Sequence, residues 1–284
     1  MENKKIINIV DVAFAHSTSS SLNNIPKHIE WCRTFNRDEE QDLIIFTDQC
    51  IFQKPRFKCK KSIFWLIEPV STYPYSYSFV KENINHPDFA DYILTYDKEL
   101  CKLSDKVIFY PHSGSWIHEN DFGIYPKTKM CSIILSNKKQ TTGHRMRWAA
   151  VENFPDKFDI FGRGTDKPLD YKLDGLKDYR YSVVIENIKQ DDYYTEKIID
   201  SFSTATIPLF WGTDNIRSYF NEKGIIKFDT ISELKFLIDN ICCEQDYLSR
   251  MPAIKHNLNE CRKYRISEDW IWENWLGEIY DDIV

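Results

Sequence analysis

Two adjacent charged residues, Glu196 and Lys197, stand at the predicted start of a helix, directly after Thr195. A helix N-terminus presents unpaired N–H groups and roughly half a unit of positive charge, so it suits a diphosphate. Lys197 adds a full positive charge there, whereas Glu196 is better suited to accept hydrogen bonds from sugar hydroxyls. Tyr193 offers a hydroxyl to a phosphate group and an apolar ring. The alternative is that Glu196 and Lys197 are ordinary surface residues of a first helical turn.

Two short apolar runs flank this helix and predict the strands that position it. The run 183–185 ends on Glu186 and Asn187, and the run 207–211 is stopped by Gly212. Strand, helix and strand in this order form a βαβ unit of a parallel sheet. Ligands of such sheets bind at the carboxyl ends of the strands, beside helix N-termini. We therefore expect Asn187 and the start of the helix to lie at a binding edge.

The whole stretch from Ile185 to Gly212, IEN-x5-YYTEKIIDSF-x4-IPLFWG, closely resembles the donor-binding signature of family 10 glycosyltransferases, the α1,3/α1,4-fucosyltransferases. The resemblance places Asn187 in the donor site, Tyr193 and Lys197 at the pyrophosphate, and Glu196 at the ribose hydroxyls. It also implies an α/β fold of the GT-B type, in which two Rossmann-like domains with parallel sheets face a cleft.

An arginine on a second predicted helix completes the expected donor site. Ser136 and Asn137 end a predicted strand, and Arg145 and Arg147 follow on the helix. The family has an arginine at such a place that contacts the donor phosphates. A guanidinium group can bind two phosphate oxygens at once and stabilise the charge that grows on a leaving diphosphate. Arg145 fits the family spacing slightly better, and Arg147 is the alternative; either could instead be a solvated helix residue.

Glu68 is the expected catalytic base. It ends the apolar run 63–67 and precedes Pro69, and the family has a glutamate at such a strand end. The flanking residues differ from the family pattern, since this chain reads Ile67-Glu68-Pro69. Inversion at an anomeric carbon requires a carboxylate that deprotonates the acceptor hydroxyl. The alternative is a structural strand-end glutamate.

Length and composition limit the class of protein. The chain has 284 residues, 42% of them hydrophobic, and a net charge of −6, which argues against a general nucleic-acid binder. Its eight cysteines form no Cys-x-x-Cys pair, so we expect reduced thiols and a cytoplasmic location. Neither a signal peptide nor an apolar run of 18 residues is evident, so we expect a soluble protein without a transmembrane segment.

We expect an N-terminal acceptor-side domain, 1–122, and a C-terminal donor-binding domain, 123–284, whose terminal helix packs back on the first. A helix is expected from Pro26 through Phe35. The expected strands of the first domain are 5–12, 42–48, 61–69, 90–96 and 106–110. Those of the second, besides the two described above, are 130–135, 158–161 and 224–228. Its further helices are expected at 144–154, 231–241, 245–262 and 267–283.

The expected activity is that of an inverting glycosyltransferase that transfers L-fucose from GDP-fucose to a glycan hydroxyl in α1,3 linkage. Its expected partners are thus a nucleotide sugar and a glycan acceptor, with no cofactor and no obligatory metal, because neither Asp191-Asp192 nor Glu119-Asn120-Asp121 forms a convincing metal–diphosphate motif. His16, His112, His118 and Trp116 are candidates for acceptor contacts. The alternatives are another nucleotide sugar as donor, or an inactive glycan-binding protein of the same fold.

Overall fold

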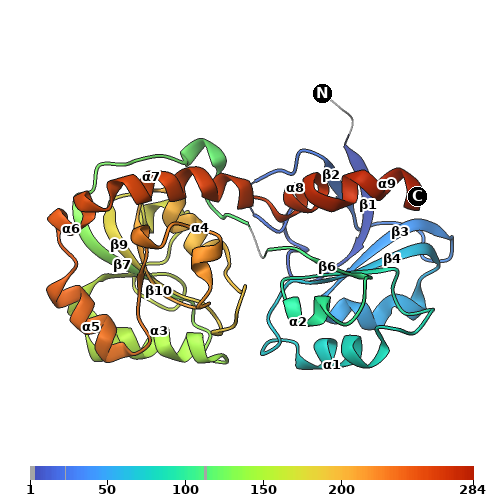
Figure 1. Cartoon of the computed structure of the whole chain (residues 1–284), viewed down its shortest axis with the longest axis horizontal. Helices are drawn as coiled ribbons and strands as arrows, with labels where there is room; N and C mark the ends of the chain where they lie inside the picture. Colours follow the sequence, from blue (N-terminus) through green and yellow to red (C-terminus); the bar gives the residue numbers. More distant parts are fainter. Residues whose placement is uncertain (1–3, 23, 112–113) are drawn as a thin grey trace. The chain divides into compact units, whose positions relative to one another are not determined.

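The computed structural model describes residues 4–22, 24–111 and 114–284 (Figure 1). The chain divides into two compact units: unit 1 comprises residues 1–112 and 266–284, and unit 2 comprises residues 113–265. The division expected from the sequence, 1–122 and 123–284, differs from this one in two respects. The first boundary lies ten residues earlier, and the last 19 residues belong to the first unit. Each unit is described by itself.

Within the described residues, unit 1 contains a six-stranded sheet with the order β2-β1-β3-β4-β5-β6. All the strand pairs are parallel. The strands are β1 (Lys5–Val10), β2 (Ile29–Cys32), β3 (Gln41–Thr47), β4 (Cys59–Leu66), β5 (Tyr92–Thr95) and β6 (Val107–Phe109). The last five residues of β3 and of β4 are all buried. The continuous apolar runs in the sequence predicted this burial, because a parallel sheet is covered on both faces. Helices α1 (Pro74–Asn83) and α2 (Lys98–Cys101) follow β4 and β5.

The order of these strands sets the place of a binding site. The chain passes from β1 outward to β2 and then returns to β3 on the other side of β1. Connections on the two sides of this point leave in opposite directions, so the loops after β1 and β3 separate and open a crevice. The carboxyl ends of β1 and β3 are therefore the place in unit 1 where a ligand is expected.

The helix predicted from Pro26 through Phe35 is wrong. Residues Ile29–Cys32 form β2, which pairs in parallel with β1 from Lys5↔Ile29 to Asn8↔Cys32. The two large apolar residues of this segment, Ile29 and Trp31, stand two residues apart, which is the repeat of a strand. A proline before the segment is compatible with either structure. The segment forms a strand because its main chain pairs with β1.

The end of the chain packs on the sheet of unit 1. It consists of α8 (Ser267–Ile271), a π-helical turn (Trp272–Leu276) and α9 (Gly277–Ile283), which lie beside β1 and β2 in Figure 1. Ile271, Leu276 and Tyr280 are buried in the same apolar cluster as residues of β1, β3 and β4. The fully buried carboxylate of Glu268 accepts hydrogen bonds from the Ser20 main chain at 2.7 Å and from Trp31 Nε1 at 3.0 Å.

Unit 2 contains, within the described residues, a five-stranded sheet with the order β11-β10-β9-β7-β8, again with every pair parallel. The strands are β7 (Lys129–Ile134), β8 (Asp159–Phe161), β9 (Tyr179–Ile185), β10 (Ile207–Trp211) and β11 (Ile226–Lys227). The chain runs from β7 outward to β8 and returns to β9, so the change of direction falls between β7 and β9. The carboxyl ends of these two strands form the expected crevice of unit 2.

Helices cover both faces of this second sheet. One apolar cluster joins β7, β9 and β10 to α3 (Thr142–Asn153) and α5 (Ile231–Asn240), and another joins β9 and β10 to α4 (Glu196–Ser203) and α7 (Met251–Glu260). The helix predicted at 245–262 is divided into α6 (Glu244–Ser249) and α7, with Pro252 in the first turn of α7. Proline has no N–H to donate and is favoured at a helix start. No helix in the described ranges combines the length and apolar character needed to cross a membrane.

Candidate active site

The crevice of unit 2 brings the start of α3 against the end of β9. The Gly143 N–H donates to the Asn187 carbonyl at 3.0 Å. A Cβ atom on Gly143 would lie 1.6 Å from the Glu186 carbonyl oxygen, so only glycine allows this approach. Thr141 caps the helix by accepting from the His144 N–H at 3.2 Å. The main chain that carries Glu186 and Asn187 is thereby fixed to the N-terminus of α3.

Glu186 organises the start of α4 from the opposite side. Its carboxylate is fully buried and accepts hydrogen bonds from the Thr195 N–H at 2.8 Å and from the Thr195 hydroxyl at 2.8 Å. Thr195 is the N-cap residue of α4. The Lys197 ammonium group lies 3.2 Å from the same carboxylate and 2.8 Å from the Thr195 hydroxyl. Glu186 therefore holds both the cap and the first-turn cation of α4.

Lys197 is a partly buried cation between two carboxylates. Its Nζ lies 3.2 Å from Glu186 Oε2 and 3.6 Å from Glu196 Oε1. Burial alone would lower the pKa of Lys197, but the two carboxylates outweigh burial and the nearby charge of Arg147, and the pKa is raised. Lys197 is thus held as an ammonium group at the N-terminus of a helix, where the sequence predicts an anionic ligand.

The structure brings Arg147 rather than Arg145 to this cluster. Arg147 is buried, and its guanidinium group donates to Asn187 Oδ1 at 2.8 Å. Burial lowers its pKa, and the charges of Glu186, Glu196 and Tyr193 act against this effect. Its buried Nε finds no hydrogen-bond partner among the described residues. Arg145 is exposed and instead donates to Gln140 O at 2.8 Å and to Thr142 Oγ1 at 3.3 Å, so it is the alternative, Arg147, that contacts Asn187.

The other two predicted donor residues also belong to the cluster. Tyr193 is buried and lies within electrostatic reach of Arg147. The carboxylate of Glu196 lies 3.6 Å from Lys197 and 3.7 Å from Lys172. Five predicted or alternative donor residues therefore gather at one strand edge: Arg147, Asn187, Tyr193, Glu196 and Lys197. Two cations and one uncommitted guanidinium N–H in this crevice can bind phosphate oxygens.

Lys172 and Glu186 are members of this site that the sequence did not identify as functional. Lys172 Nζ lies 2.6 Å from the buried carboxylate of Asp200 and 4.8 Å from the ring centre of Trp116. Asp200 also accepts from the Trp116 N–H at 2.9 Å, which fixes Trp116 in unit 2 beside Lys172. Glu186 stands in the signature quoted above, but the sequence did not indicate that its side chain points inward. His112, one of the acceptor candidates, lies outside the described residues.

Glu68 lies in unit 1, two residues after β4. Its side chain is partly buried, and its main chain is held by two side chains: Asp48 Oδ1 accepts the Glu68 N–H at 3.0 Å, and the Tyr77 hydroxyl donates to the Glu68 carbonyl at 3.0 Å. Burial raises the pKa of Tyr73, and the charges of Asp48 and Glu68 raise it further, so Tyr73 lies within electrostatic reach of Glu68. Glu68 is thus a strand-end carboxylate on a rigid main chain, as a catalytic base requires.

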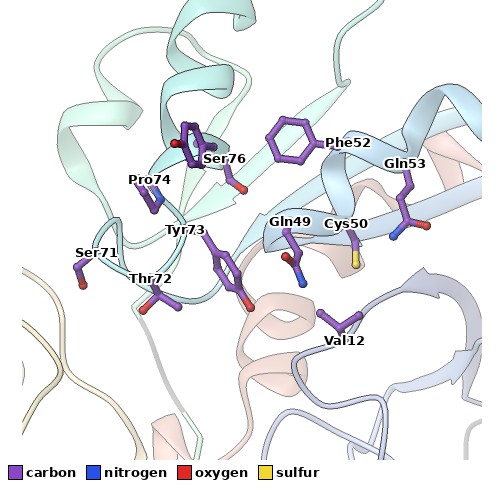
Figure 2. A pocket seen from close by; sticks show the side chains of 11 residues that line it. Val12, Gln49, Cys50, Phe52, Gln53, Ser71, Thr72, Tyr73, Pro74 and Ser76 are labelled. Carbon is purple, nitrogen blue, oxygen red and sulfur yellow. The ribbon is translucent and has the colours of Figure 1, made fainter. Parts of the chain in front are cut away.

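A cavity of about 620 Å³ opens at the carboxyl ends of β1, β3 and β4, which is the crevice expected for unit 1 (Figure 2). In Figure 2 the side chains of Tyr73, Gln49 and Val12 face one another across it. The lining combines aromatic rings, hydroxyl groups and amide groups, and the residues are Val12, Gln49, Cys50, Phe52, Gln53 and residues 71–76. Such a mixture suits a ligand with apolar faces and many hydroxyl groups.

This chain is similar to fucosyltransferases in its fold and in part of its sequence. A structure of an α1,3-fucosyltransferase with GDP-fucose shares the fold, with a TM-score of 0.55 and 17% identity over 92% of this chain and 90% of that chain. The α-(1,3)-fucosyltransferase FucT of Helicobacter pylori is 33% identical over 70 residues, which are 25% of this chain and 15% of that protein. A putative fucosyltransferase-like protein of Arabidopsis thaliana is 35% identical over 137 residues, 46% of this chain and 26% of that protein. The matches thus span about a quarter or less of these two relatives' length.

Two parallel doubly wound sheets and the shared fold define an α/β protein of the GT-B type, as expected. The model of glycosyltransferase family 10 (fucosyltransferase), C-terminal part, matches residues 124–248, which lie within unit 2 and contain all five residues of the donor-side cluster. Residues 124–248 thus form a domain of the glycosyltransferase family 10 type, and the resemblance inferred from the sequence is confirmed.

Proposed function

We propose that this protein is an inverting glycosyltransferase that transfers L-fucose from GDP-fucose to a glycan hydroxyl in α1,3 linkage. One observation carries the proposal. At the crevice of a family 10 domain, Lys197 in the first turn of α4 lies beside Glu196, and Arg147 on α3 donates to Asn187, so two cations and the signature residues gather where the resemblance implies a sugar nucleotide.

The donor half of the proposal assigns a role to each member of the cluster. Lys197 and Arg147 bind the diphosphate and stabilise the charge that grows on it as the sugar leaves. Two N–H-rich helix starts and two cations supply the positive charge that a metal ion supplies elsewhere, so we propose that no metal is required. Glu196 accepts hydrogen bonds from the ribose hydroxyls, and the Tyr193 hydroxyl reaches a phosphate oxygen.

The acceptor half of the proposal lies in unit 1. The glycan enters the cavity of unit 1, where the rings of Tyr73 and Phe52 contact the apolar faces of a sugar and Gln49 bonds to its hydroxyls. Glu68 removes the proton of the attacking hydroxyl, and the sugar is transferred with inversion. We further propose a reducing, cytoplasmic location, since all eight cysteines are free.

Nucleotide binding and transfer can be tested separately. The purified chain is titrated with GDP and UDP by calorimetry, and labelled GDP-fucose is then presented with a glycan array. We expect binding of GDP with a clear preference over UDP, and transfer to a subset of glycans. Glu68→Gln should abolish transfer and leave the affinity for GDP within about twofold, because Glu68 and the donor cluster lie in different units.

Each alternative predicts a different result. Binding of UDP in preference to GDP would assign another donor. Tight GDP binding without transfer to any glycan on the array, unchanged in Glu68→Gln, would favour a binding protein that kept the fold. Full transfer activity in Glu68→Gln would remove Glu68 from the mechanism.

A further inference from the structure

Asp48 combines two features that each cost free energy. It directly follows β3 and begins the short 3-10 segment Asp48–Arg56. Its side chain is fully buried, and its φ angle is 42°, in the left-handed region that few residues other than glycine adopt readily. Burial of a carboxyl group is costly unless its oxygens are hydrogen-bonded, yet Oδ2 has no hydrogen-bond partner among the residues that the structure describes. The contacts of Oδ1 indicate what such a residue does here.

Oδ1 of Asp48 binds the main chain at the proposed catalytic base. It accepts the N–H groups of Ile67 at 2.8 Å and of Glu68 at 3.0 Å. From the other side, the Tyr77 hydroxyl donates to the Glu68 carbonyl at 3.0 Å. Both main-chain polar groups of Glu68 are therefore held by side chains of neighbouring elements, although Glu68 lies outside β4.

We propose that Asp48 is a positioning residue for Glu68: its carboxyl group accepts the N–H groups of Ile67 and Glu68 and so fixes the main chain of Glu68 just beyond the end of β4. The inference rests on the proposed function, because it takes Glu68 as the base. Its consequence is a base whose main chain is held in one place by hydrogen bonds from neighbouring elements.

The surroundings of Asp48 raise its pKa into the neutral range, so its charge changes between about pH 6 and 8. Burial raises the pKa of Asp48 to about 7, and the charge of Glu68 acts in the same direction, whereas the two main-chain N–H groups act against it. Among the described residues, the ionisable groups most strongly coupled to Asp48 come from four parts of unit 1 and include no cation: Cys50, Glu68, Tyr73, Tyr77 and Tyr110. Two ionised carboxylates here would repel each other without compensation.

Two substitutions separate the contact from the charge. Asp48→Gly removes the acceptor oxygen and tolerates the positive φ, whereas Asp48→Asn keeps an acceptor oxygen, tolerates the positive φ and cannot ionise. We expect Asp48→Gly to lower kcat for fucose transfer from GDP-fucose at least tenfold. We expect Asp48→Asn to stay within about threefold of the wild type at pH 7 and to show a flatter dependence of kcat on pH between pH 6 and 8. Both should bind GDP as the wild type does.

The outcomes distinguish this inference from the proposed function. Loss of transfer in Glu68→Gln together with unchanged kcat in Asp48→Gly would overturn the positioning role alone, and full activity of Glu68→Gln would overturn the proposed function. A folded Asp48→Asn that loses as much activity as Asp48→Gly would also contradict the inference. If Asp48→Gly does not fold, Asp48→Asn and Tyr77→Phe decide: an unchanged pH profile in the first and unchanged kcat in the second would overturn it.

Discussion

The ammonium group of Lys197 lies 3.2 Å from the Glu186 carboxylate, which is fully buried. The same carboxylate accepts two hydrogen bonds from the N-cap residue Thr195, so one acidic side chain fixes the helix start and its cation together. A ligand diphosphate then meets a lysine that is already charged and oriented. Pre-ordering of this kind reduces the entropic cost of binding.

Glu186→Gln should therefore lower stability as well as nucleotide affinity. The substitution leaves the partly buried Lys197 beside a neutral amide, and loss of one partner of a buried ion pair typically costs about 3–5 kcal/mol. We expect a loss of about 3 kcal/mol in the free energy of unfolding, measured by urea denaturation, because the amide oxygen still accepts from Thr195. Glu99→Gln, which breaks the exposed pair with Lys102, is the control and should change stability by less than about 1 kcal/mol. Equal effects of the two substitutions would contradict the role of Glu186.

Arg145 and Arg147 provide a matched pair for the donor site, since they lie on one helix two residues apart. Arg147→Ala should weaken the binding of GDP about 30-fold, because charge-assisted hydrogen bonds contribute about 2 kcal/mol. Arg145→Ala should leave the affinity within about twofold. Arg147→Lys should remain weak, because lysine keeps the charge but loses the planar fork. Calorimetric titration with GDP measures all three, and a larger loss in Arg145→Ala than in Arg147→Ala would restore the original preference for Arg145.

The same two arginines show where the sequence was informative and where it was not. The signature from Ile185 to Gly212 located the family, the strand β9 and the helix α4. It could not reveal which of the two arginines on the helix turns inward. Successive helix positions differ by about 100° around the axis. The partner of the inward arginine, Asn187, lies 40 residues later in the chain. Long-range partners of this kind are set by the fold.

The helix expected from Pro26 and the inward direction of Glu186 were missed for a related reason. Local pattern did not distinguish a four-residue edge strand from a helix, and only pairing with β1 decided it. A glutamate at a strand end can face solvent or the interior. Glu186 faces the interior because Thr195 and Lys197 bind its carboxylate there. Continuous apolar strands, by contrast, were predicted well, because complete burial in a parallel sheet leaves a clear pattern.

His144 should make the stability of the protein depend on pH in the acid range. Burial, together with the charges of Arg147, Lys138 and Lys197, lowers the pKa of His144 from 6.5 to about 4. The unfolded chain binds a proton on this residue below pH 6.5 while the folded protein does not until about pH 4, so stability falls as the pH decreases through this window.

His144→Gln keeps a residue that can form the capping box with Thr141 but does not titrate. We expect the difference in unfolding free energy between wild type and variant to change by up to about 3 kcal/mol from pH 7 to pH 4, in favour of the variant at low pH. Urea denaturation across this range measures it. Parallel stability curves for the two proteins would show that His144 does not titrate as its burial implies.

Gly143 joins the start of α3 to the end of β9, and its replacement should disrupt both of these parts of the donor site. A Cβ at this position would lie 1.6 Å from the Glu186 carbonyl oxygen, which is main chain and cannot turn away. Gly143→Ala must therefore separate α3 from the end of β9, lengthen the hydrogen bond to the Asn187 carbonyl and move Arg147 away from Asn187.

Gly123→Ala is the matched control, because its added Cβ would meet nothing closer than 3.9 Å. We expect Gly143→Ala to lose more than about 3 kcal/mol of stability and at least tenfold in affinity for GDP, and Gly123→Ala to stay within about 0.5 kcal/mol. Unaltered GDP binding by Gly143→Ala would mean that the contact between α3 and β9 does not shape the nucleotide site, and the argument from Arg147 would lose its geometric basis.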